Sequence, residues 1–562
     1  MLRFVKILLC SVLLAAQANT FAQDGFKSSD QRVEYLDLFS QAGIFLLKSQ
    51  TDKALQAYQR CIELNPMSSA SYFQIGNIYF SSGDYQASEL FAQKAVDIQP
   101  SNVLYLNLLA DANLKNGNLD AAISNTKRAL ESYPSYDNYH ALTQLYISSG
   151  NFSDAISLLD SFEKNFGYEV SNGVRKSELY RMSGDLPNAE KELMRIIDTD
   201  STNIYYYFML VDLYFQTGQI PKIQTVINQM EKIDPENGLV YLAKSSLCRA
   251  TLKVDCFYQN LIQSFNSDDV LFSEKLMNLS ILVSEEQLLN ETQVDSLFAV
   301  MKVHYPDSSS VYSLHADYLF FIKEYKKSIV ELSNAIRLDK NDFVLWRKLF
   351  HLYYIIEDYN HLGATVNDAF SYYPEQLDVF LYAALSSFLT GHLTDGEDYL
   401  IQSEAFGVEE SSSAYFYYFI KGVYYYLKND SKNSLEYFNQ YFLMGNSSHF
   451  MLAQYAFYLT QMNAKMDLAE RIIKQCVSFD QFNTYFYYVY ANYFLKKNDL
   501  KSSVYFIDKS LSLDHCGLSS IYELAGDIYR KNNNCEKAVL YWNKAKNDSN
   551  AQKLMNKIKN CN

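Results

Sequence analysis

The stretch that decides the fold of this 562-residue chain is Ser69–Pro134, which contains one pattern twice. The first copy reads SASYFQIGNIYFSSGDYQASELFAQKAVDIQP, and the second reads VLYLNLLADANLKNGNLDAAISNTKRALESYP. Residues of the same kind recur at an offset of 34 positions, in the pairs Gly76 and Ala110, Gly83 and Gly117, Ala95 and Ala129, and Pro100 and Pro134. Self-similarity at this period is typical of a stacked array of helical hairpins.

Each recurring residue type has a physical reason at its place in such a hairpin. A small residue such as Gly76 lets the two helices approach closely, so a larger side chain there should cost about 1–3 kcal/mol through overpacking. Gly83 should end the first helix, because helices commonly stop at a residue that tolerates positive φ. Pro100 should end the second helix, since its ring cannot continue the hydrogen-bonded ladder.

The pattern resembles the tetratricopeptide repeat (TPR), which places large apolar, small, aromatic and proline residues at fixed positions. In the copy that begins at Ser69, the matching residues are Tyr72, Ile75, Gly76, Tyr79, Ser88, Ala95 and Pro100. The resemblance implies an all-α fold, a right-handed superhelical solenoid of about 14–15 TPR-like hairpins with a C-terminal capping helix.

The repeat template divides the chain without any linker rich in proline, glycine or serine. We expect a signal peptide at 1–22, a polar lead-in at 23–34, an N-terminal TPR array at 35–237, irregular helical hairpins at 238–308, a C-terminal TPR array at 309–548 and a capping helix at 549–562. The irregular segment either reflects sequence drift in a packed solenoid or marks a hinge or docking element. A repeat array explains the length, because each unit packs only on its neighbours.

The N-terminus has the features of a secretory signal. Arg3 and Lys6 precede the apolar run Ile7–Ala16, and a cleavage site is expected between Ala22 and Gln23. The alternative is an uncleaved anchor, although the apolar run is short for a bilayer span. We therefore expect a protein secreted across the inner membrane into the periplasm, with no transmembrane segment after cleavage and with association with the outer membrane left open.

Composition and motifs limit the possible functions. The formal net charge of -15 makes nucleic acid an unfavourable partner. The sequence contains no HExxH motif, no phosphate-binding loop, no paired-cysteine metal spacing and no serine elbow. We expect a protein that is not an enzyme and that uses no cofactor or metal.

The TPR resemblance implies that partners bind in the concave groove, which helix A lines with its positions 2, 5, 9, 12 and 13. In the first half, position 9 holds the polar residues Asn77, Asp111, Gln144, Glu178 and Asp212. In the second half, groove positions hold the apolar and aromatic residues Leu385, Phe388, Phe416, Phe419, Tyr426 and Leu427. Apolar side chains in an exposed concavity mark a partner site. The alternative is that tight superhelical curvature buries these aromatic side chains as core.

The predicted function is a scaffold or adaptor of the bacterial cell envelope that binds protein or peptide partners. Glu523–Asp527 and Lys537–Trp542 look like the end of long envelope TPR proteins of Gram-negative bacteria. The competing hypothesis is a permanent structural subunit of an envelope or secretion assembly.

Repeat geometry also ranks the cysteine pairs. Cys535 falls at the tip of the last hairpin, and the capping helix should return Cys561 to that tip. We therefore predict a disulfide between Cys535 and Cys561; the alternative is that Cys561 stays free at the chain end. The remaining predictions are a second candidate pair, Cys248 and Cys256, and three free thiols, Cys61, Cys476 and Cys516.

Overall fold

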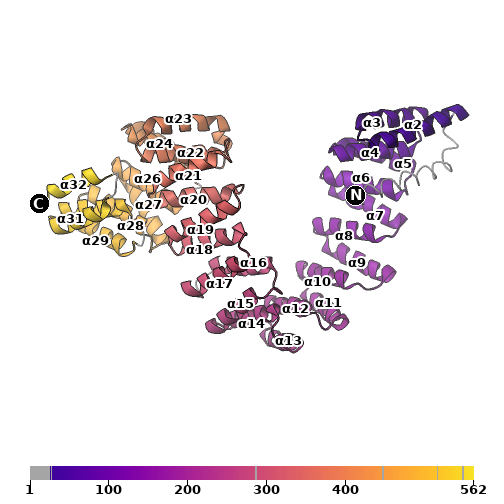
Figure 1. The fold of residues 1–562 in the computed structure, drawn as a ribbon, viewed down its shortest axis with the longest axis horizontal. Coiled ribbons are helices and arrows are strands. Elements are labelled where there is room, and N and C mark those ends of the chain that lie inside the picture. The colour runs from indigo at the N-terminus through magenta and orange to yellow at the C-terminus, as the bar shows by residue number, and fades with distance from the viewer. Residues whose placement is uncertain are drawn as a thin grey trace. The chain divides into compact units, whose positions relative to one another are not determined.

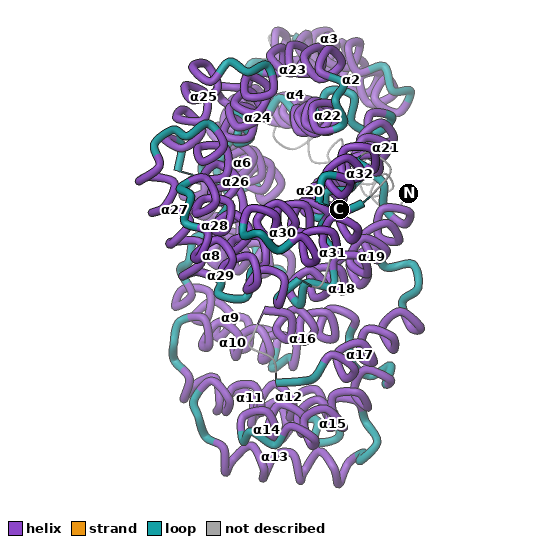
Figure 2. The backbone as a smooth tube through the Cα atoms, turned by 90° about the vertical axis from the view of Figure 1, so that its left-hand side faces the viewer, coloured by secondary structure: helices purple, strands orange, loops and turns teal. Residues whose placement is uncertain are grey.

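The structure is a computed structural model that describes residues 26, 28–284, 288–445, 448–514, 517–546 and 550–561. These residues form α-helices, two short 3-10 helices and connecting loops, with no strand among them (Figure 2). The predicted all-α solenoid is therefore confirmed. The chain divides into two compact units, Met1–Lys253 and Val254–Asn562, and the boundary falls inside the segment expected to be irregular. The predicted signal peptide lies outside the described residues.

The first unit contains helices α2 to α14, drawn from indigo to magenta in Figure 1. Their bounds are α2 (Ser29–Leu47), α3 (Thr51–Leu64), α4 (Ser69–Ser82), α5 (Tyr85–Ile98), α6 (Val103–Lys115), α7 (Leu119–Ser132), α8 (Tyr136–Ser148), α9 (Phe152–Phe166), α10 (Val170–Met182), α11 (Leu186–Thr199), α12 (Ile204–Gln216), α13 (Ile220–Ile233) and α14 (Gly238–Ala250). Helix α2 begins at Ser29, because the Ser28 side chain caps it by accepting from the Gln31 N–H at 3.2 Å. The first hairpin thus starts earlier than Tyr35, and the end of the predicted polar lead-in is helical.

The second unit contains helices α15 to α32, which reach yellow at the C-terminus in Figure 1. Their bounds are α15 (Val254–Asn266), α16 (Phe272–Ser284), α17 (Glu291–His304), α18 (Ser309–Phe321), α19 (Tyr325–Leu338), α20 (Phe343–Ile355), α21 (Tyr359–Phe370), α22 (Leu377–Leu389), α23 (Leu393–Ser403), η2 (Glu404–Phe406), η3 (Val408–Glu410), α24 (Ala414–Leu427), α25 (Ser431–Leu443), α26 (His449–Gln461), α27 (Met466–Phe479), α28 (Thr484–Lys496), α29 (Leu500–Ser512), α30 (Ser519–Lys531), α31 (Cys535–Ala545) and α32 (Ala551–Lys559). The last helix occupies the position predicted for the capping helix.

Local sequence explains how each hairpin forms. Helix α4 ends at Ser82 and is followed by the capping residue Gly83, which has a φ of 85°. The Asp84 side chain then caps α5 by accepting from the Ala87 N–H at 3.0 Å. Gly76 allows the close contact between the two helices that the sequence predicts, because a Cβ there would lie 3.3 Å from the backbone nitrogen of Ala92 in α5. The recurring small and turn-forming residues therefore set both the bend and the packing of the hairpin.

A second recurring contact joins each of several repeats to the one before it. A helix-A tyrosine donates its hydroxyl to a carboxylate of the preceding helix B, and a lysine lies over its ring. The tyrosine, carboxylate and lysine sets are Tyr214, Glu190 and Lys222; Tyr493, Glu470 and Lys497; and Tyr529, Asp508 and Lys537. These contacts hold neighbouring hairpins together as the array lengthens.

The close contacts at small residues predict opposite effects for two glycine substitutions. In α24, a Cβ at Gly422 would lie 2.6 Å from the ring of Phe438, which is fully buried and cannot move aside. We expect Gly422→Ala to lower the free energy of unfolding by about 1–3 kcal/mol. Gly43→Ala is the matched control, because no atom lies within 4 Å of its built Cβ. It should stabilise α2 by about 0.5–1 kcal/mol.

Urea unfolding of the two variants, followed by circular dichroism, checks this prediction. Equal effects of the two substitutions would contradict it.

Candidate functional site

The structure places the polar groove residues of the first unit on successive helices A. Asp111, Gln144, Glu178 and Asp212 are exposed, and Asn77 is half-buried. Their side chains are therefore accessible to a partner. Their binding role stays a prediction.

The predicted aromatic groove residues of the second unit are mostly interior. Leu385 and Phe419 are 0% exposed, Phe388 is 2% exposed and Phe416 is 6% exposed, whereas Tyr426 and Leu427 are half-buried. A side chain in the core cannot contact a partner without being displaced. Leu385, Phe388, Phe416 and Phe419 therefore do not line a groove. They are buried as core, which is the alternative that the sequence left open.

Neighbouring helices bury three of these rings, since Phe416 packs on Tyr382, Phe388 on Tyr424, and Phe419 on Phe438 and Tyr441. In addition, helices that lie far apart in the sequence contact one another. At the turn after α18, the Lys323 ammonium donates to the Asp480 carboxylate at 3.1 Å and to the Phe482 carbonyl at 2.7 Å. At the turn after α20, the Glu357 carboxylate accepts from the Ser520 N–H at 3.2 Å and from the Ser520 hydroxyl. Loops and helices that lie far apart in the sequence of the second unit are thus in direct contact.

The interior between these turns is apolar and shielded from water. The Tyr354 hydroxyl donates to the side-chain carbonyl of Gln454, and the Phe450 ring lies edge-on to both Tyr354 and His351, 6.0 Å from each ring centre. Burial lowers the pKa of His351 to about 4 and raises the pKa of Tyr354 well above its usual value. Self-contact therefore fills the concave side that the sequence predicted to be open.

A groove remains at the end of the array, where the last helices A leave a cavity of about 870 Å³. We call it the C-terminal groove. It is lined by Tyr426 of α24; Phe457 and Gln461 of α26; Tyr488, Asn492, Leu495 and Lys496 of α28; Asn498; Ser520, Glu523, Leu524, Asp527, Arg530 and Lys531 of α30; Trp542 of α31; and Lys553, Lys557 and Asn560 of α32.

Helix α32 forms one wall of this groove and is fixed there by ion pairs. The Lys557 ammonium lies 2.6 Å from the Asp527 carboxylate and 2.8 Å from that of Glu523, which also pairs with Lys553 at 2.6 Å. The Trp542 indole donates to Asp527 at 3.0 Å. Burial alone would raise the pKa of Glu523, but its lysine partners hold that pKa below its usual value. Both carboxylates are therefore already neutralised within the protein.

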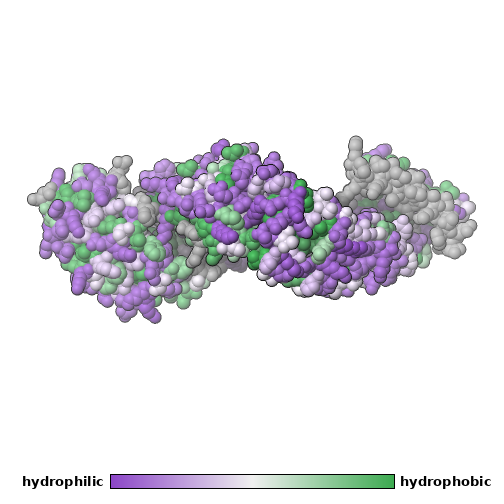
Figure 3. Space-filling model, turned by 90° about the horizontal axis from the view of Figure 1, so that it is seen from below, coloured by the Kyte–Doolittle hydropathy of each residue, from purple (hydrophilic) through white to green (hydrophobic). Residues whose placement is uncertain are grey.

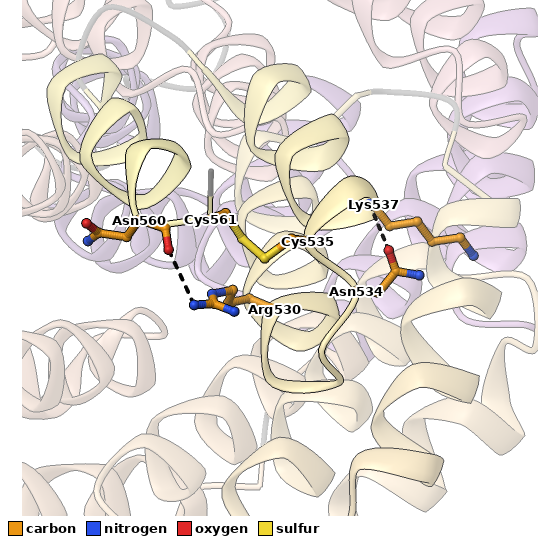
Figure 4. Close-up of a disulfide and its surroundings, with 6 residues drawn as sticks. All are labelled: Arg530, Asn534, Cys535, Lys537, Asn560 and Cys561. Atoms are coloured by element: carbon orange, nitrogen blue, oxygen red, sulfur yellow. Dashed lines mark hydrogen bonds between the residues drawn. A yellow bond between two sulfur atoms is a disulfide. The ribbon is translucent and has the colours of Figure 1, made fainter.

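A disulfide fixes the far end of the same wall. Cys535, the first residue of α31, is bonded to Cys561, and their Cα atoms are 5.6 Å apart (Figure 4). Beside the bond, the Arg530 guanidinium donates to the Asn560 carbonyl at 3.3 Å. This is the pair that repeat geometry predicted, because α32 runs back towards the tip of the last hairpin.

The other cysteines differ in state. Cys61 and Cys476 are buried free thiols, and burial raises the pKa of each to about 12. Cys248 and Cys256 are disulfide-bonded, while their pairing with each other stays a prediction. Cys516 lies outside the described residues.

One polar group in the C-terminal groove lacks a partner. The Gln461 side-chain amide donates to the Asn492 carbonyl oxygen at 3.2 Å. Asn492 is only 3% exposed, and its Nδ2 group makes no hydrogen bond within the described part of the chain. A buried donor without an acceptor is costly, so this group favours an acceptor supplied from the groove.

The sequence reasoning missed Asn492 and Asp527 as groove residues. Both occupy position 9 of their repeats, counted from Thr484 and Ser519, so the same template contained the signal. The signal was obscured because position 9 of the preceding repeats in the second unit holds apolar residues, such as Leu385 and Val423, that lie in the core.

The described residues contain no cluster of His, Cys, Asp and Glu suited to a metal ion, and none of their helices has the length and apolarity to cross a bilayer. On the face shown in Figure 3, hydrophilic side chains predominate and apolar ones lie between them.

The fold and the groove define a helical-repeat protein built from antiparallel helix pairs. The family model described as "Tetratricopeptide repeat" matches residues 69–102, the hairpin of α4 and α5.

The chain is similar to other repeat proteins at low sequence identity. It is 19% identical over 330 residues to the TPR repeat-containing protein MJ1428 of Methanocaldococcus jannaschii, an alignment that covers 58% of this chain and 54% of the relative. It is 26% identical over 148 residues to the pentatricopeptide repeat-containing protein At3g62890 of Arabidopsis thaliana, covering 25% of each chain. The chain thus spans about half or less of the length of these relatives. Among solved structures, a chain of the APC/C hetero-tetramer Cut9-Hcn1 matches 88% of this chain and 90% of its own length at 11% identity, with a TM-score of 0.44.

The closed interior of the second unit predicts opposite responses to pH at Glu357 and His351. Burial raises the pKa of Glu357, so the stability linked to this group is present at low pH and is lost as pH rises through the folded-state pKa. Burial lowers the pKa of His351 to about 4, so its contribution is present above the unfolded value of 6.5 and is lost as pH falls towards 4. We expect Glu357→Gln to gain stability relative to the natural protein as pH rises, and His351→Gln to gain it as pH falls.

Urea midpoints measured over this pH range provide the test. Profiles parallel to that of the natural protein would show that neither group is desolvated.

The disulfide should hold α32 in place. Replacing Cys535 and Cys561 by serine removes a link across 26 residues and should destabilise the C-terminal end by about 2–4 kcal/mol. Hydrogen exchange should show faster exchange in α32 and unchanged exchange in α18 and α19. Non-reducing peptide mapping is the direct check, and alkylation of both thiols in the natural protein from an oxidising compartment would contradict the bond.

Proposed function

We propose that this protein is a scaffold or adaptor that binds a protein or peptide partner in the C-terminal groove. The TPR fold supports a protein–protein interaction scaffold in general. The observation that carries the specific proposal is the cavity of about 870 Å³ at the helix-A positions of the last repeats. Pockets of this size that combine aromatic walls with a few polar groups are typical binding sites.

The groove offers both kinds of contact that a peptide needs. Phe457, Tyr488 and Trp542 provide apolar surface, whereas Gln461 and Asn492 provide amide groups. Polar groups fix the orientation of a ligand and apolar surface supplies much of its affinity. We assign no chemical reaction to this site.

We also propose that the protein acts in the periplasm of a Gram-negative bacterium. The N-terminal pattern of Arg3, Lys6 and the following apolar run supports export. The disulfide between Cys535 and Cys561 supports an oxidising compartment, where such bonds form and persist.

Site-specific photocrosslinking in intact cells tests the proposed function. A photoreactive amino acid at Leu524, a half-buried residue of the groove, should give a discrete adduct with a partner. The same amino acid at Tyr505, an exposed residue of α29 that does not line the groove, is the matched control. Adducts of equal yield at both positions, or at neither, would overturn the proposal.

The solution state separates the adaptor from a permanent structural subunit. An adaptor should purify alone as a folded, soluble species and bind its partner reversibly. Recovery only in a stoichiometric complex would favour the structural subunit.

A further inference from the structure

We propose that helix α2 is a dimerisation surface, against which α2 of a second copy of this chain packs in the antiparallel direction. This inference is independent of the C-terminal groove and concerns the N-terminal end of the first unit, where α2 lies beside α3 (Figure 1). It follows from an uncovered apolar stripe on α2, from the symmetry of that stripe and from the charges at its two ends.

One face of α2 is apolar and exposed to solvent. It carries four large apolar side chains, which we call the α2 stripe: Val33 (67% exposed), Leu36 (36%), Ile44 (48%) and Leu47 (58%). Their spacing places them on one side of the helix. The buried residues Tyr35 and Ala42 lie on the opposite side, which packs in the core of the first unit.

The later repeats show what covers this face elsewhere in the array. Ile44 has an equivalent in each of the next five helices A, at or within one residue of the 34-residue offset, namely Ile78, Ala112, Leu145, Leu179 and Leu213. All five are between 0% and 7% exposed. The preceding hairpin accounts for this burial, as Ile78 packs in one core cluster with Ala42 and Tyr58 of the first hairpin. Within the described residues, Ile44 has no preceding hairpin to cover it.

The two ends of the array differ in how they are finished. A repeat array needs a polar outer face on its terminal element to stay soluble. Helix α32 meets this need, because it buries Leu554 and exposes mainly polar side chains, those of Gln552, Lys553, Asn556 and Lys559. This polar cap is a poor match for the α2 stripe, so stacking of one copy's first hairpin on the last hairpin of another is unfavourable. A second α2 offers a matching apolar surface.

The stripe is complementary to itself when two α2 helices run antiparallel. Val33 and Leu47 lie seven residues to either side of Ser40, and Leu36 and Ile44 lie four residues to either side. A two-fold axis beside Ser40 therefore places Val33 opposite Leu47 of the second copy, and Leu36 opposite Ile44. The nearby Gly43 leaves room for a close approach, since no atom lies within 4 Å of a Cβ built there.

The charges at the ends of the stripe favour the same direction. Asp30 in the first turn and Lys48 just after the last turn are both exposed, and neither forms an ion pair within the part of the chain that the structure describes. In the antiparallel pair, Lys48 of each copy lies about 3 Å along the helix axis from the level of Asp30 of the other. A parallel pair would instead place like charges side by side, which is unfavourable.

Sedimentation velocity of the mature full-length protein over a range of concentrations tests the inference. We expect a reversible equilibrium in which the dimer fraction rises with concentration. Ile44→Glu should raise the dissociation constant by about 100-fold or more, because the two-fold axis introduces the buried charge twice. Leu90→Glu is the matched control, since it replaces an exposed residue of α5 that is not part of the stripe. It should leave the equilibrium unchanged.

Charge reversal tests the antiparallel direction. Asp30→Lys and Lys48→Asp should each raise the dissociation constant by about tenfold, because each turns two attractive contacts into repulsive ones. The double variant that carries both substitutions restores opposite charges at both contacts and should dimerise like the natural protein. Circular dichroism should show the same helix content in all of these variants.

Four results would overturn the inference. A monomer at every concentration would do so and would assign the stripe to a different protein. Persistence of the dimer in Ile44→Glu, or equal effects of Ile44→Glu and Leu90→Glu, would place the interface elsewhere. Failure of the double charge variant to restore the dimer would exclude the antiparallel packing. The Leu524 crosslink reports on the proposed function separately, because that residue lies in the C-terminal groove.

Discussion

The close contact between the two helices of a hairpin is the constraint on which the structure depends. At Gly526, even a single added Cβ would collide with the Trp542 ring, and at Gly76 the neighbouring backbone lies within 3.3 Å of a built Cβ. Helices that touch this closely bury their shared face within one hairpin. Each hairpin then needs only its neighbours to complete the core, so length adds no new packing problem.

This locality explains how much could be predicted from the sequence. The 34-residue pattern encodes contacts inside a hairpin and between adjacent hairpins, and these determine the all-α solenoid and the place of α32. The pattern contains no information on contacts between repeats more than 100 residues apart. The distant contacts of Tyr354 with Gln454 and of Glu357 with Ser520 were therefore not predictable from it. Phe388 and Phe419 are a different case, because neighbouring helices bury them, Phe388 on Tyr424 and Phe419 on Phe438 and Tyr441.

A local signal of the self-contact is nevertheless present in the turns. In most hairpins of the first unit the turn after helix A has a glycine with positive φ, as at Gly83, although Ser49 and Leu252 also take this conformation. In the second unit, Lys323 and Glu357 take this conformation with φ of 67° and 61°. A side chain there costs roughly 1–2 kcal/mol in backbone strain. The strain is offset because both side chains form hydrogen bonds with residues more than 150 positions later, Lys323 with Asp480 and Glu357 with Ser520. Glu357 thereby caps α30 in place of Leu518, whose side chain cannot accept a hydrogen bond.

The capping helix α32 also shapes the C-terminal groove. Helix α32 covers the last hairpin, and its Leu554 packs in the same core cluster as Trp542. Helix α32 is lysine-rich where it meets Glu523 and Asp527, because the cap must neutralise the groove carboxylates that it covers. Covering the apolar end of the core therefore also changes the charge of the groove.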